Sequence, residues 1–116
     1  MKRDMDLVRT LLITSEEDGD TDKLCEEYGQ HQVAGHIAIL IDAGLVKGAV
    51  GGDSGGRPVV GNIIRLTWAG HEFLDNARND TVWNKVKDMI KEKSMSVSFD
   101  IIASLLKSIV ISSFEL

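Results

Sequence analysis

The sequence has a single cysteine and no long uninterrupted run of apolar residues. Cys25 has no partner for an internal disulfide and is too little for a thiolate zinc site, so we expect a reducing compartment, by default the cytoplasm. The main apolar stretch, Phe99 to Phe114, contains Asp100 and Lys107. It is also shorter than the ~20 residues that a membrane span needs. The sequence therefore predicts no membrane span.

The chain also has few basic residues for its length. It carries 13 lysines and arginines against 18 aspartates and glutamates, a formal net charge of −5, and the excess of carboxylates lies in residues 1–44. With 116 residues, 43% of them hydrophobic, the chain is long enough to bury a core of its own. We predict one domain overall, with a core over residues 1–79 and a helical extension over 80–116 that packs on it.

Apolar residues at helical spacing predict helices over residues 2–14, about 32–43, 67–79, 80–93 and 98–113. The first is a helix and not a signal peptide, because charged residues interrupt its apolar stretch and no cleavage site follows. Gly44 stands where a helix ends in a left-handed residue, Thr67 is placed to cap the next helix, and Ser94 to Ser96 break the chain before the last one.

Six of the eleven glycines fall between residues 48 and 61, which predicts a glycine-rich hairpin from Leu45 to the strand 62–66. Residues 16–30 fit either a short strand or a turn of helix, and the sequence leaves both open. The predicted fold class is mainly α with a small β-hairpin, an α+β domain.

Two short motifs resemble those of winged-helix proteins. In those folds "GLV" closes the recognition helix and "LTxxG" leaves the wing; here they correspond to Gly44–Val46 and to Leu66, Thr67 and Gly70. The segments "MKRDMDLVR", "RLTWAGHEFLDNARNDTVWNKVK" and "SVSFDIIASLLK" resemble a family of short bacterial and phage-borne proteins of unknown function. The resemblance implies a winged-helix core with extra C-terminal helices and an origin in a prophage or mobile element, and it implies no established activity.

A winged helix reads DNA with the second helix of a helix-turn-helix, so residues 16–30 would have to supply the first. The candidate DNA contacts are Gln32, His36, Lys47, Arg57 and Arg65. DNA binding is weakly supported, because residues 32–43 contain no lysine or arginine and the acidic first half repels a polyanion. The lysines at 85, 87, 91 and 93 are typical of a solvated helix face.

A protein partner or self-association is the other hypothesis. The candidate interface residues are Ala38 and Ile39 on the second helix, and Ile101 and Leu105 on the last one. Burial within one monomer explains the same residues equally well. We predict a protein-interaction or adaptor module, with a DNA-binding transcriptional regulator as the alternative.

Enzymatic chemistry has little support. The stretch "GGDSGGRP" resembles the nucleophile loop of trypsin-like proteases, but those enzymes need a double β-barrel about twice this length, so a flexible hairpin tip is the better interpretation. Cys25, His31, His36 and His71 lack the spacing of metal ligands. We therefore predict no catalytic residue, metal, cofactor or small-molecule substrate.

The two tryptophans, Trp68 and Trp83, fall on apolar helical faces. A large aromatic side chain at such a position is more often part of the core than of an interface. We expect both to be buried.

Overall fold

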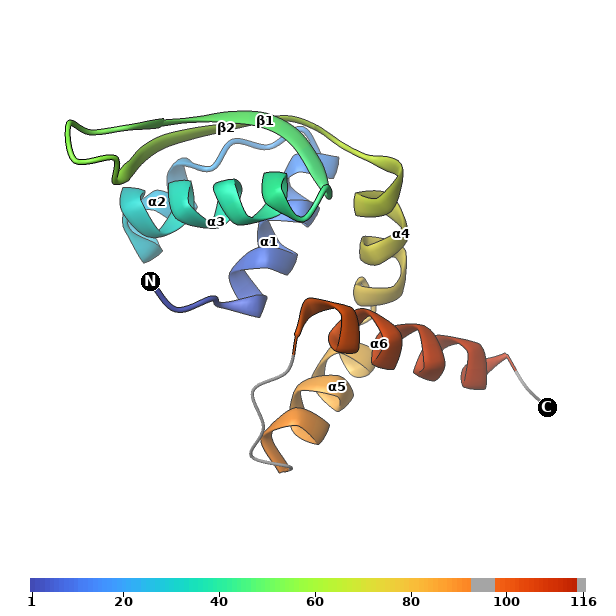
Figure 1. Cartoon of the computed structure of the whole chain (residues 1–116). Helices are drawn as coiled ribbons and strands as arrows, with labels where there is room; N and C mark the ends of the chain where they lie inside the picture. The colour runs from blue at the N-terminus through green and yellow to red at the C-terminus, as the bar shows by residue number, and fades with distance from the viewer. Residues whose placement is uncertain (93–97, 115–116) are drawn as a thin grey trace. The chain divides into compact units, whose positions relative to one another are not determined.

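The computed structural model describes residues 1–92 and 98–114, and the chain divides into two compact units, Met1–Glu72 and Phe73–Leu116. In the first unit three helices precede a two-stranded antiparallel hairpin (Figure 1). The boundary between the units falls inside helix α4 (Trp68–Ala77). The predicted α+β class, mainly helical with a small hairpin, is confirmed. The predicted boundary at residue 79 and the packing of the extension on the core stay predictions.

Helix α1 (Met5–Glu16) begins directly after Asp4. The Asp4 carboxylate accepts hydrogen bonds from the backbone amides of Asp6 and Leu7, at 3.0 and 3.2 Å. These bonds satisfy two amides that the first turn of a helix leaves without an internal partner. The buried side of the helix consists of Leu7, Val8, Leu11 and Leu12.

The region that the sequence left undecided contains helix α2 (Asp22–Tyr28), which buries Leu24. The helix ends at Gly29, whose amide donates to the carbonyl of Cys25 at 2.8 Å and whose φ of 89° favours glycine. Helix α3 (Gln30–Asp42) starts at the next residue. Residues 16–30 therefore supply a helix directly before α3.

Helix α3 ends as its glycine predicts. The amide of Leu45 donates to the carbonyl of Leu40 and the amide of Gly44 to that of Ile41, both at 3.0 Å, while Gly44 has a φ of 76°. This pair of bonds around a left-handed residue is the Schellman motif. It turns the chain into the first strand of the hairpin.

Strands β1 (Val46–Gly52) and β2 (Pro58–Leu66) form the hairpin, and β2 starts four residues before the predicted strand. Gly61 lies against α3, where an added Cβ would come within 2.9 Å of Ile37 Cδ1. The absence of a side chain at Gly61 lets β2 approach the helix closely. Helix α3 is thus covered by the hairpin on one side (Figure 1).

Thr67 caps the N-terminus of helix α4. The Thr67 hydroxyl accepts a hydrogen bond from the Gly70 amide at 3.1 Å and donates one to the Gly44 carbonyl at 2.6 Å. The predicted cap is confirmed, and it also ties the start of α4 to the end of α3.

The second unit contains helices α5 (Asp80–Glu92) and α6 (Phe99–Ser113). The Asn79 side chain caps α5 by accepting from the Val82 amide at 3.1 Å, and Ser98 caps α6. Phe73 of α4 and Phe99 of α6 stack with ring centroids 4.8 Å apart. Phe73 is nearly buried, and the other fully or nearly buried side chains described in this unit are Leu74, Ala77, Trp83, Val86, Ile102 and Leu106.

The prediction that Trp83 is buried is confirmed, since 2% of its surface is exposed. The predicted break at Ser94 to Ser96 lies outside the described residues. None of the helices in the described part of the chain combines the length and apolar character that a bilayer span requires.

Candidate binding surface on the hairpin

The hairpin exposes every second residue over much of its length. On β1 these are Lys47, Ala49 and Gly51, and on β2 they are Val60, Asn62, Ile64 and Arg65. The register sets Gly51 opposite Val60, Ala49 opposite Asn62 and Lys47 opposite Arg65. We call these seven residues the hairpin outer face.

The hairpin outer face carries large apolar side chains in solvent. Val60 is 64% exposed and Ile64 is 70% exposed, while the residues of β1 beside them are small. The first residue of α4, Trp68, is 79% exposed. Exposed apolar side chains that share one face, as Val60 and Ile64 do, are typical of an interaction site.

The position of Trp68 corrects the prediction that it belongs to the core. Helix α4 buries Phe73, Leu74 and Ala77, and Trp68 lies about 140° around the helix from Phe73 at ~100° per residue. Its indole N–H instead donates to Glu72 Oε1 at 2.8 Å. The side chain is held on the surface of the helix.

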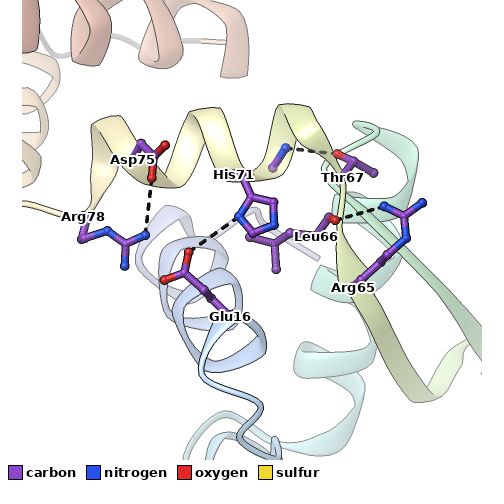
Figure 2. Close-up of polar contacts among 8 residues, drawn as sticks. Glu16, Arg65, Leu66, Thr67, His71, Asp75 and Arg78 are labelled. Atoms are coloured by element: carbon purple, nitrogen blue, oxygen red, sulfur yellow. Dashed lines mark hydrogen bonds and ion pairs between the residues drawn. The ribbon is translucent and has the colours of Figure 1, made fainter.

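Two cations are cross-strand partners at the base of the hairpin outer face. Lys47 lies opposite Arg65, and neither forms a salt bridge with a carboxylate of the described residues. One guanidinium nitrogen of Arg65 donates to the carbonyl of Leu66 at 3.2 Å (Figure 2). Like charges directly opposite each other destabilise a sheet. The pair therefore forms a local excess of positive charge.

Lys47 lies at the base of the hairpin and not at its tip. Arg57 is the cation at the tip. There one Asp53 carboxylate oxygen accepts from the amides of Gly55 and Arg57, each at 2.9 Å, and holds the turn that contains Ser54. The candidate DNA contacts on the hairpin are thus separated, with Arg57 at one end and Lys47 and Arg65 at the other.

His36 is buried, which removes it from the candidate DNA contacts. Its Nε2 accepts a hydrogen bond from the Asp4 amide at 2.8 Å, and its Nδ1 lies 2.8 Å from the Gln32 carbonyl. The N-terminal residues bring about this burial, since the Met1 side chain also lies where a Cβ on Gly35 would project. Gln32 is partly buried on the same helix.

Three carboxylates lie close enough to Tyr28, the last residue of α2, to act on its phenol. The pKa of the Tyr28 phenol is raised by partial burial and by the carboxylates of Glu27, Asp4 and Asp6. A phosphate group would meet the same carboxylates. The surroundings of Tyr28 are therefore unfavourable for a phosphate.

The predicted protein-interface residues are less exposed than the hairpin outer face. Ala38 and Ile39 are partly buried on α3. On α6, Ile101 is 47% exposed and Leu105 is partly buried. These four residues lie in two different units.

Ionisable residues elsewhere form few groupings. His71 Nδ1 lies 3.7 Å from Glu16 Oε2 (Figure 2), and His31 Nδ1 lies 2.7 Å from the Pro58 carbonyl.

A pocket of about 300 Å³ lies between the loop at residues 18–22 and residues 61–64 of β2. Across residues 1–92 and 98–114, no three histidine, cysteine or acidic side chains come together as metal ligands do.

Val60 and Ile64 were not predicted from the sequence to be surface residues. A signal was present, because Val60, Asn62 and Ile64 alternate with Gly61 and Ile63 as expected for a strand with one exposed face. The strand was predicted to start only at residue 62, so this alternation was not recognised.

Comparison with known proteins gives one family. Residues 2–96 match the model of a family described as hypothetical protein, DUF2513. A relative from Haemophilus influenzae, labelled as an uncharacterized protein, is 36% identical over 95% of this chain and 96% of its own length. No solved structure matches.

Proposed function

Since the chain belongs to the DUF2513 family, whose description names no activity, we propose a function from its own surface: a winged-helix protein that acts by binding another protein, as an interaction or adaptor module. The observation that carries this proposal is the exposure of Val60, Ile64 and Trp68 on the hairpin and the start of α4. Large apolar and aromatic side chains of this kind are enriched at protein interfaces.

The order of elements supports the winged-helix assignment. Helices α2 and α3 follow each other across Gly29, and a hairpin comes next, as in a helix-turn-helix with a wing. Its usual use in DNA binding has less support here. The middle of α3 is buried from Val33 to Ile37, and no lysine or arginine lies on that helix.

The proposed activity is binding and not chemistry, and no cofactor or metal is part of it. The single cysteine, Cys25, is free, which agrees with a cytoplasmic location. The resemblance to phage-borne proteins supports a prophage or mobile-element setting, in which the partner would be a host or phage protein.

One feature favours the alternative, a DNA-binding regulator. Arg57 is exposed at the tip of a hairpin that follows a helix-turn-helix. In that arrangement the wing would contact phosphate or a minor groove. Its affinity would then fall steeply with added salt.

Site-specific photo-cross-linking in the native cell tests the proposal. A photoreactive residue at position 64 should give a discrete protein adduct, and one at position 88 of α5, also exposed, should not. In parallel, the anisotropy of a labelled random-sequence duplex should stay unchanged at low salt. Salt-sensitive duplex binding together with cross-links to DNA would favour the regulator instead.

A further inference from the structure

We propose that the hairpin outer face binds a segment of a partner protein in which a carboxylate lies next to apolar side chains. The carboxylate would lie between Lys47 and Arg65, and the apolar side chains would cover Val60 and Ile64. The inference rests on the proposed function and adds the chemistry of the partner to it.

The pair of cations at the base of the hairpin outer face argues for a carboxylate at that end. Lys47 and Arg65 are cross-strand partners, and no salt bridge to either is formed within the part of the chain that the structure describes. Placing like charges opposite each other costs stability, which a bound anion would recover. Because the register sets the two residues opposite each other, one carboxylate could accept a charge-assisted hydrogen bond from each of them.

The shape of the surface argues for apolar neighbours of that carboxylate. Val60 lies opposite Gly51, so its side chain has no bulky cross-strand neighbour there. Ile64 is the residue between Ile63 and Arg65 that the register leaves without a partner on β1, and it is 70% exposed. Apolar side chains that follow the carboxylate along an extended segment would remove both side chains from water.

A nucleic acid fits this surface less well. The hairpin outer face has two cations, Lys47 and Arg65, at its base, whereas non-specific DNA binding draws on many phosphate contacts. The net charge of −5 and the carboxylates around Tyr28 would oppose a long polyanion.

A second copy of this chain also fits less well. In a two-fold dimer the same surface meets itself. The seven residues of the hairpin outer face include no carboxylate, so a second copy would leave Lys47 and Arg65 of both chains without an opposite charge from that face. A partner with the complementary charge is favoured.

The test is selection of a random linear peptide library displayed on phage against the immobilised full-length chain, with the strongest peptide then synthesised and titrated. We expect selected peptides to be enriched in aspartate or glutamate next to leucine, isoleucine, valine or phenylalanine. The affinity for the synthetic peptide should fall about tenfold or more in each of three variants, Lys47→Glu, Arg65→Glu and Ile64→Ser. The matched control, Lys85→Glu on α5, should bind as the unmodified chain does.

Circular dichroism and urea unfolding of each variant separate loss of the surface from loss of the fold. Selection of basic peptides, no selection at all, or equal binding by the charge-reversed variants would overturn the inference. Preferred binding of a random-sequence duplex, or a charge-insensitive dimer by light scattering, would overturn it too. A protein adduct from position 64 together with no acidic peptide would leave the proposed function standing and reject the inference alone.

Discussion

Thr67 Oγ1 donates a hydrogen bond to the carbonyl of Gly44 at 2.6 Å, which joins the start of α4 to the end of α3 across the whole hairpin. The same hydroxyl accepts from the Gly70 amide and so caps α4. Thr67→Val keeps the shape and loses both bonds, and we expect it to lower the free energy of unfolding by ~1–2 kcal/mol. Thr67→Ser should retain most of the stability in the same urea titration. Equal losses for the two variants would show that the hydroxyl is not the cause.

Gly70 packs against the backbone of Leu45, and a Cβ added there would lie 2.0 Å from the Leu45 carbonyl oxygen. That oxygen already accepts from the Thr67 amide at 2.9 Å, so it has little freedom to move. Gly70→Ala should therefore destabilise the fold by about 1–3 kcal/mol or more. Gly55→Ala is the control, because the atom nearest to a Cβ added there is 3.4 Å away. Thermal unfolding should show a much lower midpoint for the first variant than for the second.

The environment of His36 fixes its tautomer. The Asp4 amide can only donate, so Nε2 must accept, and the proton on Nδ1 is directed to the Gln32 carbonyl. Long-range ¹H–¹⁵N correlation spectra should show a neutral imidazole protonated at Nδ1. His36→Ala should lower the free energy of unfolding by ~1–3 kcal/mol, because the Asp4 amide loses its partner. A proton found on Nε2 would contradict this account.

Trp68 and Trp83 should respond differently to the same substitution. Trp83→Ala removes a buried side chain and should cost ~3–5 kcal/mol. Trp68→Ala removes an exposed one, and its stability should change by about 0.5 kcal/mol or less. Acrylamide should quench the fluorescence of the Trp83→Phe variant, which retains Trp68, more strongly than that of Trp68→Phe. Comparable quenching would mean that Trp68 is covered in solution.

The repulsion between Lys47 and Arg65 should lower the free energy of unfolding by a measurable amount. Lys47→Glu replaces a like-charge pair with an opposite-charge pair, so we expect the free energy of unfolding to rise by a few tenths of a kcal/mol. The gain should shrink in about 1 M salt, where screening acts over ~3 Å. Lys85→Glu provides the comparison at an exposed lysine of α5. A loss of stability in Lys47→Glu would indicate that the two cations are not close enough to repel each other.

Local signals in the sequence determined much of this fold. Gly44 ends α3, Thr67 caps α4, and the spacing of Leu7, Val8, Leu11 and Leu12 produces the buried side of α1. Each depends on hydrogen bonds or side-chain contacts within about one or two helical turns. A reader of the sequence can recognise such features because the residues that cause them are close together in the chain.

The tertiary structure alone decided the candidate surface. His36 is buried by a residue that lies 32 positions away, and Lys47 meets Arg65 only through the register of the hairpin. Trp68 is exposed because α4 turns Phe73, Leu74 and Ala77 inward. The periodicity of apolar residues along the chain indicates which side chains share a face, whereas only long-range packing determines which face is covered. The sequence by itself therefore determined most of the elements, though not α2 or the start of β2, and the packing of distant segments determined which side chains are left for a partner.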